Sequence, residues 1–390
     1  MFRRKLAAWL LLFISCLLTL AFLFRVKDKM VDFEVNYTAA KRLRLGETLY
    51  RSADGHYQFK YLPFSAFLYL PVSTLPLSLA KATWYGVVIC CSFLIFFLSF
   101  RLINPEKQKF LWVAVFPPLI LARYFLREVQ LGQINALITL LLLAMISRLL
   151  AQPSSFRSES GRGTVRQVGA GLFGGLATAL KPYALIFFPY FIIRKKWLCL
   201  AVCLVVLGLG LFAPSLFYGV RGNLTVLKEW QASLAASTPS LFSSQDNVSL
   251  LAFLIKWTGR QTLSLVFYFF ILAGLGLLSL LLFAKGKAVP RPALLDGFLL
   301  LALIPLISPL GWDYTFLSAA PAVMLILYHH DKYRPFWRAF LYVNFAVIAL
   351  SLYDLMGREI YASFMSVSII TINFVILIGY VSFLRLKGHA

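Results

Sequence analysis

The sequence contains few of the residues that build metal sites or covalent cross-links. It has five cysteines and four histidines in 390 residues. All five cysteines lie within apolar runs, and neither their spacing nor their surroundings fit a zinc site or a disulfide framework. No group of His, Asp and Glu side chains has the spacing of metal ligands. We therefore expect a protein that works without a metal or another cofactor; a divalent metal is the alternative, which no residue pattern supports.

Acidic residues are also scarce, with 15 Asp and Glu against 38 Lys and Arg, which gives a formal net charge of +23. The sequence shows no internal repeat, no low-complexity tract and no separate soluble domain. Instead, 60% of the residues are hydrophobic, whereas soluble domains average roughly 45–50%. A single integral membrane domain over residues 1–390 is predicted, and its basic charge needs no nucleic-acid partner as an explanation.

Long apolar runs dominate the chain. Many windows of about 17–25 residues carry few charges, and this is the length that crosses a bilayer core. The runs are continuous rather than alternating, which favours helices over a barrel. We predict an all-α polytopic membrane protein with about twelve spans. The expected spans are 6–24, 81–100, 110–126, 134–150, 168–180, 183–193, 198–216, 264–284, 293–308, 314–329, 338–353 and 361–384. The short pair 168–180 and 183–193 leaves one long span open as an alternative.

The basic residues indicate how these spans are oriented. More than half of the Lys and Arg fall in the termini and in the loops that this span order places on the same side as the termini. The positive-inside rule assigns that side to the cytoplasm. Both termini are therefore predicted to be cytoplasmic, and the other loops to face the extracytoplasmic side of a bacterial-type inner membrane.

Two long outer segments, 25–80 and 217–263, interrupt the apolar pattern. The first contains Asp32 and predicts a helix over 33–45, which Gly46 would end. Its later run, 61–76, is broken by prolines and suits interfacial helices resting on the bilayer. Asp32 has two interpretations that the sequence leaves open. It is either the N-cap of the helix or a carboxylate that acts on a substrate held at the membrane surface.

Polar and aromatic side chains gather at other outer connections. Amide groups are costly in lipid unless they are hydrogen-bonded, and aromatic faces suit the apolar faces of sugars. These properties favour carbohydrate binding over an ordinary polar turn or an aromatic belt at the interface. The residues that share this position are Gln130, Gln133, Asn135, Trp312, Asp313 and Tyr314.

Lys181 interrupts an apolar segment. An ionisable residue at membrane depth suggests a function, and Lys is a suitable point charge for a phosphate. Arg123 and Arg127 could pair with a lipid phosphate as well. A snorkelling turn lysine and arginines that touch lipid headgroups are the structural alternatives.

Taken together, these segments resemble glycosyltransferase family 87. The matching pieces, in chain order, are Asp32 with Tyr37 and Ala39-Ala40, Gly46, Leu49-Tyr50, Tyr61-Leu62-Pro63, Gly132-Gln133-Ile134-Asn135, Leu180-Lys181-Pro182, Asn247-Val248-Ser249, and Ser308-Pro309 with Trp312. The resemblance implies the C-type glycosyltransferase (GT-C) fold. It also implies transfer of mannose or a related hexose or pentose from a polyprenyl-phosphate donor to a lipid or glycan acceptor on the outer face of the membrane.

The resemblance further implies roles for individual residues. Asp32 is the expected general base of an inverting transfer. The residues expected to hold substrate are Tyr37, Tyr61, Gln130, Gln133, Asn135, Asn247, Trp312, Asp313 and Tyr314. Those expected at the donor phosphate are Lys181, Arg123, Arg127 and Arg358. The alternative function is a secondary transporter or a flippase for lipid or polyprenyl-linked sugar, which broken helices and an intramembrane lysine also fit.

Overall fold

The computed structural model describes residues 16–150, 159–284 and 291–388. Within these ranges the chain is helical, apart from one isolated bridge between Asn247 and Trp312, so the all-α prediction is confirmed for them. The longer helices are α2 (Val31–Leu45), α3 (Leu77–Ile103), α6 (Ala122–Leu131), α7 (Asn135–Leu150), α8 (Glu159–Leu180), α10 (Trp197–Phe212), α11 (Ser215–Ser237), α13 (Gln261–Ala284), α14 (Pro292–Ile307), α16 (Pro335–Leu350), α17 (Tyr353–Ser366) and α18 (Ile369–Lys387). The shorter ones are α4 (Phe110–Ala114), α5 (Phe116–Ile120), α9 (Phe187–Ile193), α12 (Leu250–Thr258) and α15 (Ala320–Tyr328).

Apolar helices occupy the predicted spans. Among the described residues, α3, α13 and α18 are each long and apolar enough to cross a membrane. Three further pairs qualify if each counts as one bent span, with bends of 49° before α6, 90° between α10 and α11, and 101° between α16 and α17. Residues 6–15 of the first predicted span lie outside the described residues. The chain is thus an integral membrane protein by composition and helix length, and the number of about twelve spans stays a prediction.

The segment 168–193 forms two helices rather than one. α8 ends at Leu180, Lys181 is extended with φ −155° and ψ 124°, and Pro182 begins a 3₁₀ turn, η6 (Pro182–Ile186), that leads into α9. Proline cannot donate the backbone hydrogen bond that would continue α8, so the break follows from the sequence. It places Lys181 at a helix end, where its side chain is free to enter a polar cluster.

Close packing of α8 against α10 depends on small residues. A Cβ at Gly171 or Gly175 would lie 2.6 Å from a valine side chain of α10, a distance that no real side chain tolerates. The two glycines are four residues apart and so lie on one face of α8. This is the small-xxx-small contact by which membrane helices approach each other closely.

α2 begins at Val31, with Met30 as its N-cap residue, so the interpretation of Asp32 as the N-cap is wrong. Asp32 is instead the second helical residue. There its charge still lies near the positive end of the helix, while its side chain is free to contact other elements. Gly46 ends the helix in the left-handed conformation, with φ 67°, as predicted.

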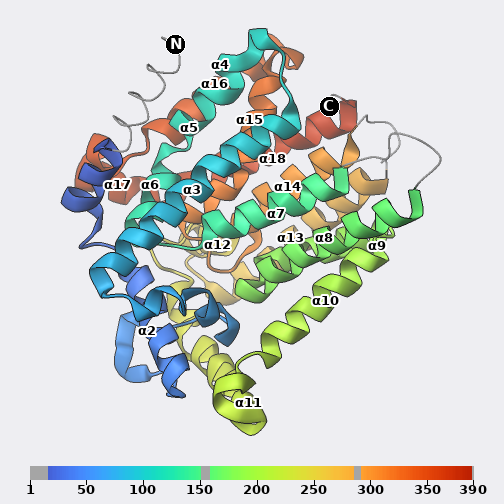
Figure 1. Cartoon of the computed structure of the whole chain (residues 1–390). Coiled ribbons are helices and arrows are strands. Elements are labelled where there is room, and N and C mark those ends of the chain that lie inside the picture. The colour runs from blue at the N-terminus through green and yellow to red at the C-terminus, as the bar shows by residue number, and fades with distance from the viewer. Residues whose placement is uncertain (1–15, 151–158, 285–290, 389–390) are drawn as a thin grey trace, which may run out of the picture.

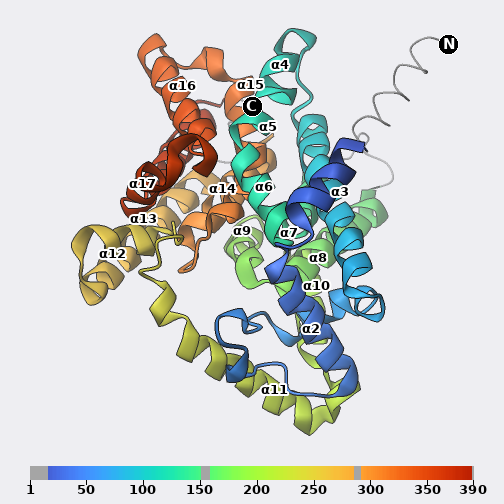
Figure 2. The ribbon, with the colours of Figure 1, turned by 90° about the vertical axis from the view of Figure 1, so that its left-hand side faces the viewer.

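α2 of the first outer segment and α11 of the second lie together at one end of the molecule, away from the C-terminus (Figure 1). After α2, the first segment continues through short 3₁₀ turns, namely η2 (Ser52–Tyr57), η3 (Pro63–Tyr69) and η4 (Val72–Thr74). α11 of the second segment runs beneath α2 and these turns (Figure 2). Tyr218 Oη donates to the carbonyl of Glu47 at 2.7 Å, and Trp230 Nε1 donates to that of Lys60 at 3.2 Å. These bonds hold α11 against the first segment.

Candidate functional site

Apolar packing next to Asp32 brings it to the connection between α6 and α7. Phe33, the next residue on α2, is fully buried, and its Cβ lies 2.7 Å from where a Cβ of Gly132 would be. Trp84 of α3 donates from Nε1 to the carbonyl of Gly132 at 2.9 Å, and its ring stacks on Phe33 with a centroid separation of 6.0 Å. Gly132 has φ 69° and no side chain, so α2 can approach closely enough for Asp32 to reach Gln133.

Gln133 is the centre of a polar cluster at this contact. Its Nε2 donates to Oδ2 of Asp32 at 2.7 Å and to the hydroxyl of Tyr314 at 3.0 Å. Its Oε1 accepts from the hydroxyl of Tyr61 at 3.1 Å. Residues from α2, from the 61–76 run, from the α6–α7 connection and from the turn η8 (Asp313–Ala319) therefore meet at one amide group. The predicted base and three of the residues predicted to hold substrate are brought together in this way.

Lys181 joins the same cluster from the break after α8. Its Nζ donates to Oδ1 of Asn135 at 2.8 Å and lies over the rings of Tyr61 and Tyr183, at 5.1 and 4.6 Å from their centroids. The side chain is buried, and its ammonium group contacts an amide oxygen and two aromatic faces. A buried cation held in this way is suited to an anionic ligand group.

Glu128 is the residue of this site that the sequence analysis missed. It is completely buried near the end of α6. Its Oε2 accepts from Nδ2 of Asn135 at 2.9 Å, and its Oε1 accepts from the backbone N–H of Ala136 at 2.8 Å. The carboxylate thus caps the start of α7 and turns the oxygen of Asn135 toward Lys181. The sequence could have indicated Glu128, because it is an acidic residue in the same polar connection as Gln130, Gln133 and Asn135.

The electrostatic surroundings of Asp32 suit a base. Burial raises the pKa of its carboxyl group above the ordinary value of 3.8. The hydrogen bond from Gln133 and the positive charges of Lys181, Arg127 and His56 act in the opposite direction, lowering the pKa, but burial dominates. A carboxylate with a raised pKa accepts a proton more readily than an exposed aspartate does.

Two more of the predicted residues form an ion pair with each other. Arg123 Nη2 lies 3.0 Å from Oδ2 of Asp313, and both side chains are buried. Arg123 also donates to the carbonyl of Ser351 and to the hydroxyl of Tyr361, each at 2.6 Å. Asp313 accepts from the backbone N–H of Tyr314 at 2.8 Å, which links this pair to the cluster around Gln133.

The other two predicted phosphate-binding arginines are more accessible. The Arg127 side chain is 40% exposed, with Nε 4.0 Å from Asp313 Oδ1 and Nη1 3.5 Å from Oε1 of Gln130. Arg358 is exposed on α17, and no ion pair to it is found among the described residues. Unlike Arg123, these two guanidinium groups are open to a ligand.

The remaining predicted substrate-binding residues make contacts within the protein. Asn247 is fully buried, its Nδ2 donates to the carbonyl of Pro309 at 3.1 Å, and its Oδ1 accepts from the backbone N–H of Gly311 at 3.0 Å. It thereby fastens the second outer segment to the loop that carries Trp312, which is half-buried. Tyr37 donates its hydroxyl to the carbonyl of Leu75 at 2.7 Å.

No group of three or more His, Cys, Asp or Glu side chains that could hold a metal ion occurs in the described part of the chain. The carboxylates of the site are each bound to amide, backbone or guanidinium donors, as described above. Independence from metal stays a prediction.

Comparison with known proteins places these residues in a family context. A polyprenol-phosphate-mannose-dependent α-(1-2)-phosphatidylinositol pentamannoside mannosyltransferase of Mycolicibacterium smegmatis is 22% identical over 338 residues, covering 82% of this chain and 75% of that protein. Two solved structures of ArnT from Cupriavidus metallidurans are also similar. The one bound to undecaprenyl phosphate has 13% identity and a TM-score of 0.46, covering 98% of this chain and 78% of that one. The apo structure has 14% identity and a TM-score of 0.42, covering 97% and 78%.

The family profile matches a continuous region that includes much of the site. It covers residues 59–309, and so contains Tyr61, Glu128, Gln133 and Lys181, whereas Asp32 lies before it. Asp32 is connected to the matched region by its hydrogen bond with Gln133. Because the matched region makes up more than half of the 390 residues, the chain belongs to glycosyltransferase family 87.

Proposed function

We propose that this glycosyltransferase takes a sugar from a polyprenyl-phosphate donor and transfers it to a hydroxyl group of a lipid or glycan acceptor on the outer face of the membrane. The dependence of the mycobacterial relative on polyprenol-phosphate-mannose supports the class of donor. The observation that carries the site is the 2.7 Å hydrogen bond between Gln133 and Asp32. It connects a half-buried carboxylate with the amide and lysine cluster of the family-matched region.

In this proposal Asp32 is the general base. Its carboxylate accepts the proton of the acceptor hydroxyl, whose oxygen attacks the anomeric carbon of the donor sugar. The bond from that carbon to the phosphate oxygen breaks, and polyprenyl phosphate leaves with the electron pair. One displacement with one base inverts the anomeric configuration.

The other side chains bind and orient the donor. Lys181 supplies a positive charge for the phosphate, because its ammonium is held by an amide oxygen and aromatic faces. The exposed arginines Arg127 and Arg358 add positive charge for the same phosphate. Arg123 positions the loop that contains Asp313 through their ion pair. Tyr61, Gln133 and Tyr314 carry hydroxyl and amide groups for the sugar, together with Asn135 and Trp312. The polyprenyl tail lies along the run 61–76.

The GT-C fold, the extracytoplasmic position of the site and the cytoplasmic termini belong to the same proposal. The outer segments with Asp32 lie at one end of the helices and the C-terminus at the other (Figure 1), as this topology requires. The bent helix pairs and the lysine at the break after α8 also fit the transporter or flippase alternative. The family match favours a glycosyltransferase over it.

A matched pair of variants tests the base. Asp32→Asn removes the proton acceptor, and Asp28→Asn removes an exposed carboxylate four residues earlier in the same outer segment. We expect a deletion strain complemented with wild type or Asp28→Asn to contain a glycolipid or glycan with an added hexose or pentose, visible by mass spectrometry. Complementation with Asp32→Asn should leave the acceptor unmodified while the donor accumulates. Equal products from both variants would remove Asp32 from the mechanism.

A further inference from the structure

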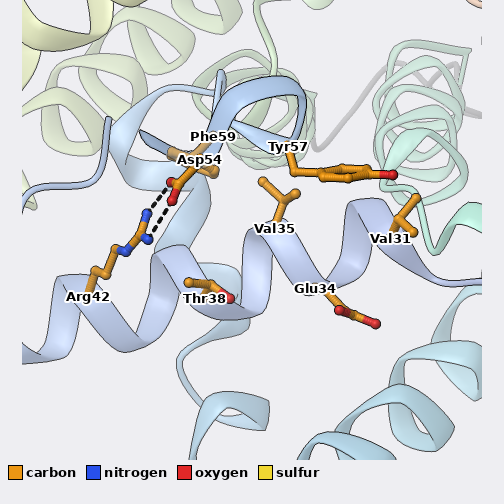
Figure 3. A pocket seen from close by; sticks show the side chains of 8 residues that line it. All are labelled: Val31, Glu34, Val35, Thr38, Arg42, Asp54, Tyr57 and Phe59. Carbon is orange, nitrogen blue, oxygen red and sulfur yellow. Dashed lines mark hydrogen bonds and ion pairs between the residues drawn. The ribbon is translucent and has the colours of Figure 1, made fainter. Parts of the chain in front are cut away.

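A cavity of about 320 Å³ lies between α2 and the turn η2. Its lining residues come from one stripe of α2 and from the chain that folds over it, namely Val31, Glu34, Val35, Thr38, Arg42, Asp54, Tyr57 and Phe59 (Figure 3). The five α2 residues recur at spacings of three and four, so they share one face of the helix. We call this cavity the α2 pocket. Nothing in the mechanism above uses it.

The α2 pocket lies next to the proposed base. Val31, at one of its ends, directly precedes Asp32, and the ring of Tyr57 lies over that end of the helix (Figure 3). His56, the neighbour of Tyr57, is close enough to influence the charge of Asp32. The pocket wall that Phe59 forms is also adjacent to the polar cluster around Gln133. The buried ring of Phe59 packs edge-on against Tyr61, which donates a hydrogen bond to Gln133.

The polar groups of the pocket are already balanced in charge. Arg42 forms two hydrogen bonds with the carboxylate of Asp54, at 2.5 and 2.8 Å. Glu34 pairs with Lys81 at 2.5 Å. A phosphate group would therefore find both of these cations already paired with a carboxylate. The pocket therefore suits a neutral ligand.

The remaining surface of the pocket has the mixed character of a sugar site. Tyr57 is 55% exposed as a residue, and an aromatic ring provides a flat face for the apolar side of a pyranose. The exposed hydroxyl of Thr38 can exchange hydrogen bonds with sugar hydroxyls, as can the outer atoms of the Arg42–Asp54 pair. The volume is near the lower end of the roughly 300–1,000 Å³ typical of small-molecule sites. It therefore admits a sugar residue, and the lipid portion of an acceptor stays outside.

We infer that the α2 pocket is the acceptor subsite and takes a sugar ring of the acceptor, stacked on Tyr57 and hydrogen-bonded by Thr38 and the Arg42–Asp54 pair. This inference rests on the proposed function. It separates the two substrates spatially: the donor phosphate binds near Lys181, and the acceptor enters over the face of α2 that carries Val31, Thr38 and Arg42. The acceptor hydroxyl then reaches Asp32 from the Val31 end of the pocket.

Kinetics of the purified protein in lipid nanodiscs test this assignment, with polyprenyl-phosphate-mannose as donor probe and octyl α-mannoside as acceptor probe. Tyr57→Ala should raise the KM for octyl α-mannoside about tenfold, and Thr38→Val about threefold, because each removes a contact to one substrate only. The KM for the donor and the rate of donor hydrolysis without acceptor should stay within twofold of wild type. Tyr57→Phe, which keeps the ring, should behave like wild type.

Thr225→Val is the matched control for Thr38→Val, because it changes another exposed helical threonine of the outer segments. It should leave both KM values unchanged. An unaltered acceptor KM in both Tyr57→Ala and Thr38→Val would overturn the assignment. A donor KM that rises in parallel would overturn it too, since the pocket would then serve the donor.

A binding measurement separates failure of this inference from failure of the proposed function. If wild type does not turn over these probes, the chosen sugar, the acceptor probe or the donor class is at fault rather than the pocket. The pocket is then tested directly with α-1,2-mannobiose by saturation-transfer difference NMR. A signal for wild type and Tyr57→Phe that is lost in Tyr57→Ala supports sugar binding in the pocket. Equal signals from all three proteins, or no signal from wild type, would refute it.

Discussion

Two carboxylates of the molecule, one fully buried and one half-buried, have opposite kinds of partner. Asp296 of α14 is fully buried and accepts from Arg385 Nε at 2.7 Å and from Arg194 Nη2 at 2.6 Å. Asp32 is half-buried and accepts from the neutral amide of Gln133 at 2.7 Å. Among the described residues it makes no ion pair. One carboxylate is held by two cations, and the other is held by none.

This difference fits a structural role for Asp296 and the proposed chemical role for Asp32. The two arginines around Asp296 join α14, α18 and the turn after α9, and they make its ionised form part of the fold. Removing one member of such a group would leave charge buried without a partner, which is strongly destabilising. The amide of Gln133 orients Asp32 without neutralising it, so the carboxylate keeps the ability to take up a proton. Site assignment in this membrane protein thus depends on what surrounds a buried acid, and burial alone is not sufficient.

The largest expected effect is on turnover in Asp32→Asn. Loss of a general base lowers the rate by about 10²–10⁴-fold, while stability should be kept. Burial raises the pKa of Asp32 in the folded protein above its value in the unfolded chain. At a pH above the unfolded pKa, the ionised carboxylate therefore lowers the free energy of unfolding. A neutral Asn does not have this unfavourable charge. Single-turnover rates and thermal unfolding in the same detergent would check both parts. A drop in unfolding temperature together with the loss of turnover would contradict the comparison.

Asp296→Asn should have the complementary phenotype. It leaves Arg194 and Arg385 without their carboxylate, at a cost of about 3–5 kcal/mol. The yield of folded protein and its unfolding temperature should fall, whereas the protein that remains folded should keep its kcat and KM. Turnover lost at unchanged stability would assign Asp296 a role in the reaction.

Glu128→Gln should have an intermediate effect, because Glu128 is a positioning residue that acts through Asn135. The new amide would present a donor to Nδ2 of Asn135, whose side chain would turn and direct its N–H groups toward Lys181. A misplaced buried hydrogen bond costs about 1–3 kcal/mol. We expect the donor kcat/KM to fall correspondingly and the acceptor KM to stay unchanged. Similar changes in both kinetic constants would instead indicate general loss of structure.

The smallest effect concerns pH. Burial raises the pKa of Asp32, so kcat/KM should decline as the pH falls through a value above the ordinary 3.8 of an aspartate. Gln133 lowers that pKa through its hydrogen bond. Gln133→Leu should therefore move the acidic limb to higher pH, in addition to any loss of rate. A limb that stays in place, or one that persists in Asp32→Asn, would show that another group titrates.

Local sequence determined much of the fold. The helical spans follow from apolar runs that can satisfy their backbone only as helices in lipid, the stop at Gly46 from its left-handed conformation, and the break at Lys181 from Pro182. Motif order along the chain also predicted the family, which the profile match confirms, and it led us to predict Asp32, Gln133 and Lys181 as site residues. These features depend on neighbours in sequence, which is why they can be read without coordinates.

Tertiary structure alone decided which of the polar residues act together. The sequence indicated that Gln133, Asn135 and Lys181 matter, but only folding brings them to Asp32, through the contact of Phe33 with Gly132. Folding also forms the ion pair between Arg123 and Asp313 and the hydrogen bonds of Asn247 to backbone groups. It buries Glu128 where its carboxylate caps the start of α7. Partners of this kind are distant in sequence, and the geometry of packed helices selects them. No spacing rule along the chain can anticipate that choice.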